Sequence, residues 1–349
     1  AYRVHLIENE LSSCNRRSEV YERIRNCRII VGTVAAISGK PELFRLKHFD
    51  VAIIDEATQI LEPQLLGILC ARGEDEKDAI DKFVLIGDHK QLPAVVQQNA
   101  EQAAIYDESL LSIGLSNLKD SLFERLYRNC TAACSSSAIH RSYDMLCRQG
   151  RMNVEVAAFP NRAFYGGLLQ PVGLEHQTGV LKLSPQLSAD EFAALLTRRV
   201  AFLPSVPESP MQSAKMNRSE AKIVAGLAAA VYRQYTFAEG CFSAASTLGV
   251  ITPYRSQIAL IKKEIEVLGI SELNQILIDT VERFQGSERD VIIYSFCVNY
   301  PYQLKFLSNL TEEDGILIDR KLNVALTRAR KQMLLTGCLL YTSPSPRDA

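Results

Sequence analysis

Two acidic side chains follow a short apolar run near the start of the chain. In VAIIDEATQ, residues 51–59, the run ends at Ile54 and is followed by Asp55 and Glu56. Phosphoryl transfer needs a divalent metal held near the phosphates and a group that orients the attacking water. Asp55 suits the metal shell, and Glu56 suits activation of the water. Adjacent acidic residues are common on protein surfaces, but directly after four apolar residues that alternative is the weaker one.

A second apolar run ends in the same way. FVLIGDHKQLPAVV, residues 83–96, places Gly87 and Asp88 at the end of a predicted strand, with Gln91 shortly after. Glycine permits a close backbone approach. The amide of Gln91 both donates and accepts hydrogen bonds, so it is able to sense a γ-phosphate. The alternative is an ordinary strand followed by a Gly-Asp turn.

These side chains require a sheet to position them, and the chain contains many runs of strand length. Strands are predicted at residues 28–31, 51–54, 83–86, 200–203, 248–252, 275–279, 291–296 and 332–335. The runs are apolar on consecutive residues, which is typical of parallel strands buried on both faces. They alternate with amphipathic stretches at 57–71, 219–235 and 253–268. This alternation predicts an α/β fold whose ligands bind at the carboxyl edge of the sheet.

Local residue types predict the start of one helix, and the length of the chain allows two domains. Asn217 and Ser219 are possible caps of the helix at 219–235, and Glu220 in its first turn suits the helix dipole. A chain of 349 residues is long enough for two domains. The predicted domains are residues 1–135 and 136–337, with peripheral insertions at 97–120 and 170–198. Residues 338–349, CLLYTSPSPRDA, are interpreted as translated adapter sequence or a disordered tail.

Composition limits the class of protein. With 39 basic and 40 acidic residues the net charge is -1, so a nucleic-acid site must be a local groove rather than a general coat of positive charge. No apolar run approaches the roughly 20 residues that cross a bilayer, so no membrane association is predicted. The start of the chain has no signal-peptide pattern, and its first residue, Ala1, indicates a natural start further upstream.

The nine cysteines are irregularly spaced and odd in number, which argues against a disulfide framework and favours the reducing cytoplasm. Cys130, Cys134 and Cys147 lack a CxxC pair or a fourth ligand. A metal site there is therefore not expected.

Six segments together resemble a known family. DEATQ followed by GDHKQLPAVV resembles motifs II and III of superfamily 1 AAA-type helicases, in the group of the nonsense-mediated-decay RNA helicase and the Okazaki-fragment nuclease-helicase. QGRM resembles the Gln-Tyr-Arg-Met motif of this group. GVITPYRSQ, DTVERFQGSERDVII and LNVALTRAR match later motifs in order. The resemblance spans about residues 29–337.

The resemblance implies two RecA-like domains with mainly parallel sheets, the first incomplete at its N-terminus, which bind ATP and Mg²⁺ between them. Asp55 is the implied metal ligand, and Arg151 and Arg328 would stabilise charge on the transferred phosphoryl group. For each arginine, a surface ion pair is the alternative. The implied catalytic residues are Asp55, Glu56, Gln91, Arg151 and Arg328. The implied cofactor-binding residues are Gly87, Asp88, Gln149, Gly286, Glu288 and Arg330, with Glu288 at the ribose and Arg330 alternatively supporting the domain interface.

Single-stranded nucleic acid is the implied partner, with DNA favoured over RNA and movement from five-prime to three-prime. The implied contacts are Thr33, Thr252, Tyr254, Thr280 and Gln285. Hydroxyl and amide groups suit phosphate and sugar, and an aromatic ring stacks on a base. For Tyr254, packing in the domain core is an equal alternative.

Two features depart from the family pattern. The phosphate-binding loop GxxxxGK[ST] does not occur in the chain. We therefore expect the chain alone to bind ATP poorly and to hydrolyse it negligibly. In QGRM, Gly150 stands where the family has Tyr, and Asn153 and Val154 follow instead of His-Pro. If that Tyr stacks on adenine in the family, this chain lacks the stacking platform.

Three functions follow as hypotheses. The first is an ATP-dependent helicase or translocase motor. The second is a motor that serves a fused or associated nuclease. The third is a non-catalytic nucleic-acid-binding scaffold, which would need none of the five implied catalytic residues.

Overall fold

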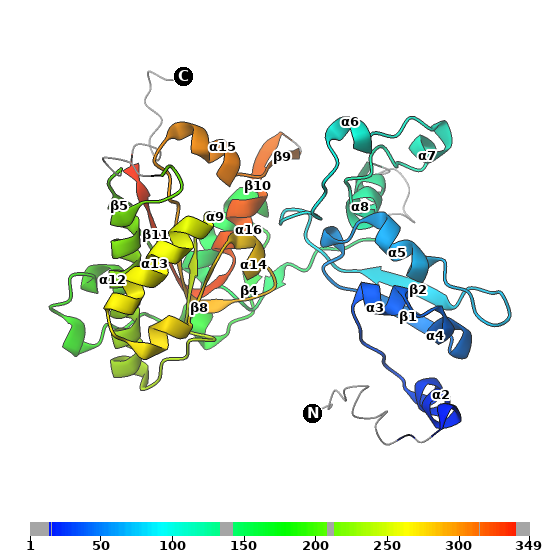
Figure 1. Cartoon of the computed structure of the whole chain (residues 1–349), viewed down its shortest axis with the longest axis horizontal. Coiled ribbons are helices and arrows are strands. Elements are labelled where there is room, and N and C mark those ends of the chain that lie inside the picture. The colour runs from blue at the N-terminus through cyan, green and yellow to red at the C-terminus, as the bar shows by residue number, and fades with distance from the viewer. Residues whose placement is uncertain (1–13, 15, 133–141, 208–212, 314, 340–349) are drawn as a thin grey trace. The chain divides into compact units, whose positions relative to one another are not determined.

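A computed structural model of the chain describes residue 14 and residues 16–132, 142–207, 213–313 and 315–339. The chain divides into two compact units (Figure 1). The first comprises Ala1–His89 and Pro93–Asp144, and the second comprises Lys90–Leu92 and Met145–Ala349. The predicted boundary between residues 135 and 136 lies outside the described residues, so the predicted domain limits stay a prediction. The described residues contain no helix long and apolar enough to span a membrane.

The first unit is built around two parallel strands, β1 and β2, in which Phe49 pairs with Ile80 and Ile54 with Leu85. Its elements are α2 (Arg17–Asn26), α3 (Val34–Ser38), α4 (Pro41–Leu46), β1 (Phe49–Ile54), η1 (Ala57–Gln59), α5 (Glu62–Leu69), β2 (Ile80–Leu85), α6 (Ala100–Ala103), α7 (Glu108–Ser112) and α8 (Leu122–Ala132). Small cores lie around Phe44 and Leu65. Because the strands are parallel and in register, both end at one edge of this sheet.

One prediction about this sheet is wrong for the described residues. Both apolar runs were expected to be buried on two faces, yet β1 exposes Val51 and Ile53, and β2 exposes Val84. Ile53 is 66% exposed, while its neighbour Ile54 is buried in the core around Leu65. The physical reason is that the described helices of this unit bury only one face of the strand pair.

The second unit contains a five-stranded, wholly parallel sheet of order β5-β11-β8-β6-β7. Its elements are β3 (Arg148–Gln149), α9 (Val154–Phe164), β4 (Gln170–Pro171), α10 (Glu175–Thr178), η3 (Pro185–Leu187), α11 (Ala193–Leu196), β5 (Val200–Ser205), α12 (Arg218–Gln234), η4 (Tyr235–Glu239), β6 (Leu248–Ile251), α13 (Arg255–Val267), η5 (Ser271–Gln275), β7 (Leu277–Asp279), α14 (Val281–Phe284), β8 (Arg289–Ser295), η6 (Pro301–Gln303), α15 (Leu304–Leu307), β9 (Leu310–Glu313), β10 (Ile316–Asp319), α16 (Arg320–Leu326) and β11 (Ala329–Cys338). The predicted α/β class with mainly parallel strands is confirmed.

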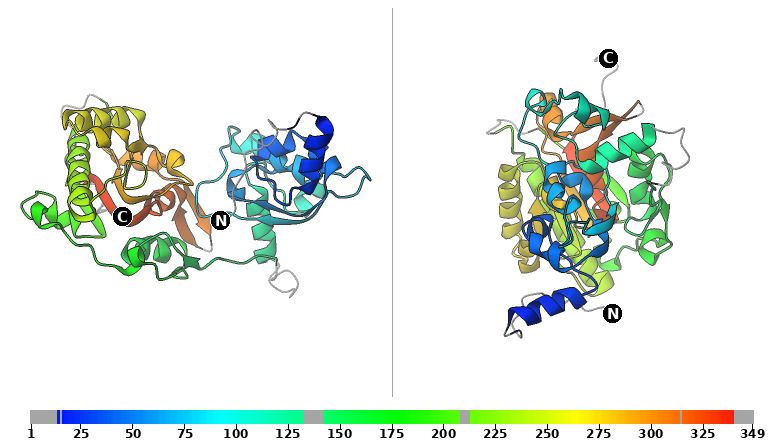
Figure 2. Two further views of the ribbon diagram at one scale, coloured as in Figure 1. Left: turned by 90° about the horizontal axis from the view of Figure 1, so that it is seen from below. Right: turned by 90° about the vertical axis from the view of Figure 1, so that its right-hand side faces the viewer.

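Successive residues of β8 pack into hydrophobic cores on opposite faces of the sheet, as expected for a strand buried on two faces. Val291 and Ile293 pack with residues of α12 and α13, which lie side by side on one face of the sheet (Figures 1 and 2). Ile292 and Tyr294 pack with residues of α9 and α16 on the other face. The predicted burial on two faces is therefore confirmed in this unit.

Three local predictions differ from the structure. Residues 28–31 form no strand, because no described strand pairs with them. The helix predicted at 57–71 is split into η1 and α5, because Pro63 has no N–H to continue a helix through that point. Cys338, assigned to the tail, is the last residue of β11 and is buried, whereas residues 340–349 lie outside the described residues.

Candidate functional site

The two carboxylates predicted to serve hydrolysis lie directly after β1, at the carboxyl edge of the strand pair. Glu56 has a left-handed backbone, with φ 53° and ψ 36°, which is uncommon for a residue with a side chain. Its N–H donates to Asp55 Oδ1 at 2.9 Å, and Gln59 Nε2 donates to Glu56 Oε2 at 2.6 Å. Both carboxylates are exposed and thus accessible to a ligand from solvent.

The segment after β2 packs tightly against the segment after β1. The N–H of Ala57 donates to the carbonyl of Ile86 at 2.8 Å. A Cβ on Gly87 would lie 2.9 Å from Thr58 Cγ2 and 3.1 Å from Thr58 N, closer than side chains tolerate. Glycine at position 87 is thus required by its neighbour Thr58, and Asp88 follows it at the same edge, half-buried. The predicted cofactor-binding roles of Gly87 and Asp88 remain predictions.

In the second unit, three predicted residues form one charged cluster. Arg151 Nε donates to Glu288 Oε2 at 2.7 Å, and Arg330 Nε lies 3.6 Å from Glu288 Oε1. Arg330 also lies 3.4 Å from Asp290, which Lys331 approaches to 3.1 Å. The surface ion pair considered for Arg151 is therefore present. The same contact brings the QGRM segment beside the segments that carry Glu288 and Arg330.

Arg328 occupies a different position, because its side chain is buried at 2% exposure. Its Nε donates to the carbonyl of Val324 at 3.0 Å. Its Nη2 donates to Thr327 Oγ1 and to Gln91 Oε1, each at 3.1 Å. The structure thus joins two of the predicted catalytic residues, Gln91 and Arg328, by a direct hydrogen bond within the second unit.

The QGRM turn is fixed by side-chain amides. Gln149 Oε1 accepts from the N–H groups of Arg151 and Met152 at 2.9 and 2.7 Å, and its Nε2 donates to the carbonyl of Met152 at 2.9 Å. These contacts position the backbone of Arg151. At Gly150 a Cβ would meet its nearest atom, Val172 Cγ2, at 3.6 Å, an ordinary contact, so crowding at the Cβ position does not require glycine there. Asn153 caps α9 by accepting from Glu155 N at 3.0 Å.

Gly286, predicted to bind cofactor, has a φ of 76°, and nothing lies within 4 Å of a Cβ built there. Its backbone conformation, rather than crowding, therefore favours glycine.

The predicted nucleic-acid contacts differ in accessibility. Thr33 caps α3, with Oγ1 accepting from Ala36 N at 3.2 Å, and lies in the first unit. Thr252 is fully buried, and Tyr254 and Gln285 are half-buried. Among the described residues, neither Thr252 Oγ1 nor Gln285 Nε2 has a hydrogen-bond partner. Thr280, at the start of α14, is half-buried as well.

A buried carboxylate that the sequence did not single out for function lies at the C-terminal ends of β5 and β8. Glu220 is fully buried in α12 and accepts from Ser295 Oγ at 2.6 Å, Cys297 N at 2.8 Å and Ser205 Oγ at 3.2 Å. Burial, partly opposed by these hydrogen bonds, raises the pKa of Glu220 to about 7. Asn217 caps α12 as predicted, accepting from Glu220 N at 2.9 Å. Only the placement of Glu220 in the first turn of the helix was predicted from the sequence.

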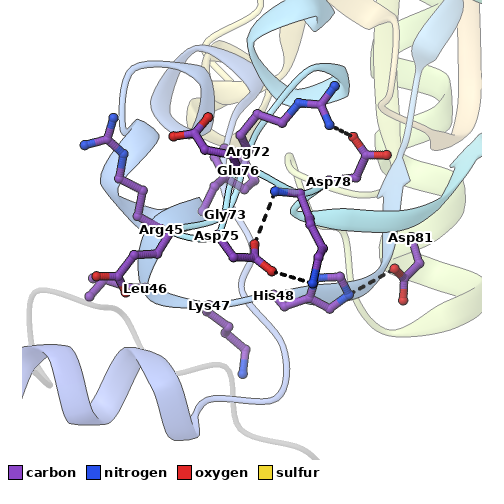
Figure 3. Close-up of a pocket in the computed structure, with 13 residues that line it drawn as sticks. Arg45, Leu46, Lys47, His48, Arg72, Gly73, Asp75, Glu76, Asp78 and Asp81 are labelled. Atoms are coloured by element: carbon purple, nitrogen blue, oxygen red, sulfur yellow. Dashed lines mark hydrogen bonds and ion pairs between the residues drawn. The ribbon is translucent and has the colours of Figure 1, made fainter.

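The first unit also contains an open pocket of about 810 Å³ (Figure 3). In its lining, His48 lies 3.0 Å from Asp81 and Lys77 lies 3.1 Å from Asp75, so these two basic groups are each paired with an acidic one. His48 directly precedes β1, whereas Asp55 directly follows it. The pocket therefore lies at the edge of the strands opposite the two carboxylates, and its lining contains none of the predicted site residues.

Known proteins resemble the chain over most of its length. Two models of the AAA domain match residues 6–99 and 118–339. The chain is 30% identical to the DNA replication ATP-dependent helicase/nuclease DNA2 of Bos taurus, over 93% of the chain and 28% of that protein. It is 29% identical to the DNA polymerase alpha-associated DNA helicase A of Saccharomyces cerevisiae, over 91% of the chain and 43% of that protein. The chain thus spans less than half the length of either relative.

The second match alone, residues 118–339, covers more than half of the chain. It includes the whole parallel sheet and the QGRM, Glu288 and Arg328 segments. The chain therefore belongs to the AAA domain family and, within it, to the superfamily 1 helicases.

Proposed function

We propose that the chain is the motor core of an ATP-driven helicase or translocase that moves on single-stranded nucleic acid. The hydrogen bond between Arg328 and Gln91 carries this proposal. It links a guanidinium group able to stabilise phosphoryl charge with an amide able to sense a γ-phosphate. A scaffold that only binds nucleic acid would need neither group.

The carboxylates of the first unit fit the metal chemistry of this reaction. Mg²⁺ is usually held by one or two carboxylates together with substrate phosphates, and when bound it neutralises charge on those phosphates. Asp55, exposed at the strand edge, fits that requirement. Glu56 would accept a hydrogen bond from the attacking water and orient it. The left-handed backbone of Glu56, braced by Asp55 and Gln59, holds its carboxylate in one direction.

The arginines of the second unit would act on the transferred phosphoryl group. Arg151 is only partly buried and ion-paired with Glu288, so exchanging this partner for a phosphate oxygen is feasible for it. Arg328 is buried and braced by backbone carbonyls, so its direction is fixed by the fold. Glu288 would contact the nucleotide ribose when released from Arg151, and Arg330 would then keep it oriented.

We include in this proposal the direction of movement, the preference for DNA and a possible nuclease partner. Movement from five-prime to three-prime and a preference for DNA rest on resemblance, and two relatives with DNA in their names support the preference. One relative is named a helicase/nuclease, which supports the second candidate function, a motor that serves a fused or associated nuclease.

A substitution of Glu56 separates a motor from a scaffold. In a protein that joins this chain to a phosphate-binding loop, Glu56→Gln should keep ATP binding and lower hydrolysis by at least about a hundredfold, because the amide cannot accept the proton of water. The measurement is ATP turnover with single-stranded nucleic acid, beside equilibrium binding of ATP. Asp50→Asn, an exposed carboxylate at the other end of β1, is the matched control and should change neither.

One result would count against the proposal: undiminished hydrolysis in Glu56→Gln would remove this residue from the reaction. ATP turnover by the chain alone would contradict only the expected need for a phosphate-binding loop and would leave the motor proposal intact.

A further inference from the structure

Three aromatic side chains lie together on the surface of the second unit, shortly after β8. Tyr300 and Tyr302 are stacked, with ring centroids 5.5 Å apart and planes inclined by 18°. Phe306 meets Tyr302 edge-on, with centroids 6.4 Å apart and planes at 85°. Their exposed fractions are 42%, 53% and 70%, so large apolar rings face solvent in this cluster.

A buried amide fixes the segment that carries these rings. Gln303 is 2% exposed, and its Oε1 accepts from the N–H groups of Asn299 and Tyr300 at 2.9 Å. Its Nε2 donates to the carbonyl of Ala214 at 2.7 Å and to the hydroxyl of Tyr254 at 3.2 Å. The rings are therefore presented by a defined turn, beside a residue already predicted to contact nucleic acid.

The same contacts join the aromatic cluster to Tyr254. Burial is the largest cause of the raised pKa of Tyr254, and the nearby phenol of Tyr302 is a smaller one. Ser256 Oγ donates to the carbonyl of Lys215 at 2.7 Å, which ties the loop before α12 to the start of α13. These hydrogen bonds thus bring three segments into contact: residues 213–218, 252–257 and 296–307.

The charged side chains of these three segments are all basic. They contain Lys215, Arg218, Arg255 and Lys305 but no Asp or Glu, although the whole chain has 40 acidic residues against 39 basic ones. All four basic residues are exposed. Nucleic acid offers phosphates that bind exposed cations and bases that stack on exposed aromatic rings, so both features of this surface fit it.

We propose that Tyr300, Tyr302 and Phe306 form a base-stacking surface for single-stranded nucleic acid, with Lys215, Arg255 and Lys305 beside it to contact the phosphates. The inference rests on the proposed function and adds a site to it. Bases in a duplex are stacked on each other within the helix, so only a single strand offers free faces to these rings. None of the three aromatic residues was predicted as a contact from the sequence.

Comparing a normal oligonucleotide with an abasic one tests this inference. The purified chain is titrated against fluorescent oligothymidylate and against an abasic oligomer of equal length, and anisotropy gives each Kd. The double variant Tyr302→Ala/Phe306→Ala should bind oligothymidylate at least about fivefold more weakly, since two stacking partners are lost. Its affinity for the abasic oligomer should not change. Tyr302→Phe, which keeps the ring, should bind like the wild type.

Phe237→Ala is the matched control. Phe237 is also exposed, but it lies beyond the C-terminal end of α12, about 25 Å along the helix from Asn217. Its loss should leave both affinities unchanged.

The outcomes distinguish this inference from the proposed function. Wild-type and double-variant chains that bind oligothymidylate equally would overturn the stacking surface and leave the motor proposal intact. Equal weakening toward both oligomers would also overturn it, because the rings would then matter only for folding. A wild-type chain that binds neither oligomer would overturn both proposals.

Discussion

At the scale of single residues, neighbours decide which chemistry a side chain supports. Arg151 and Arg328 are both arginines of family motifs, yet one is ion-paired at the surface and the other is buried against carbonyl groups. Glu220 differs from the acidic residues at the surface: it is fully buried and accepts three hydrogen bonds from residues at and just after the ends of β5 and β8. Its burial makes the folded state sensitive to pH.

The pH dependence of stability follows from the raised pKa of Glu220. Its pKa is about 7 in the folded chain, against 4.5 ordinarily, so the folded chain binds the proton more tightly. This contribution to stability is fully present below pH 4.5 and is lost as pH rises through about 7. Glu220→Gln cannot titrate. Between pH 5 and pH 8 the wild type should lose roughly 2 to 3 kcal/mol of unfolding free energy more than this variant.

Urea unfolding of both proteins across this pH range is the measurement. Glu266→Gln, which removes an exposed carboxylate from α13, serves as the control. Parallel pH curves for wild type and Glu220→Gln would show that this carboxyl does not titrate in the range.

Some residues could be singled out from the sequence and others could not. Asp55, Glu56 and Gln91 were identified because each follows an apolar run within a few residues. Glu220 and Gln303 were missed as functional or organising residues, because their hydrogen-bond partners lie far away in the sequence. Ser295, for example, is 75 positions from Glu220. A contact between residues so far apart in the sequence cannot be predicted from the local residue pattern.

At the scale of elements, similar apolar runs have different surroundings. VAIID at 51–55 and VIIYSF at 291–296 both predict a strand buried on two faces. That prediction holds for β8, which lies inside a five-stranded sheet with cores on both sides. It fails for β1, whose described neighbours cover one face only. The apolar pattern alone carries no information about which elements are present to cover a face.

Truncating one isoleucine in each strand measures this difference. Ile293 has no exposed surface and lies in the larger core, so Ile293→Ala should cost about 2 to 5 kcal/mol of unfolding free energy. Ile53 is 66% exposed, so Ile53→Ala should cost less than about 1 kcal/mol. Equal losses in chemical denaturation would mean that Ile53 is covered in solution.

At the scale of the whole molecule, the fold class could be predicted because strands and helices alternate along the chain. The limits of the units were harder, since Lys90–Leu92 belong to the second unit although they follow β2 of the first. Leu92 packs in the core with Met152, and Lys90 lies 3.7 Å from Glu313. A boundary read from composition cannot detect a short segment that packs with distant residues.

We propose above that Arg151 of the second unit serves ATP hydrolysis. The most direct test is the kcat for ATP, with single-stranded nucleic acid, of Arg151→Ala in a protein that joins this chain to a phosphate-binding loop. Arg151 is partly exposed, so its removal should leave the fold intact, and Arg148→Ala controls for loss of a nearby exposed charge. We predict that kcat falls by about a thousandfold or more in Arg151→Ala, as for loss of an arginine that stabilises phosphoryl transfer. Turnover equal to that of the wild type would contradict the account.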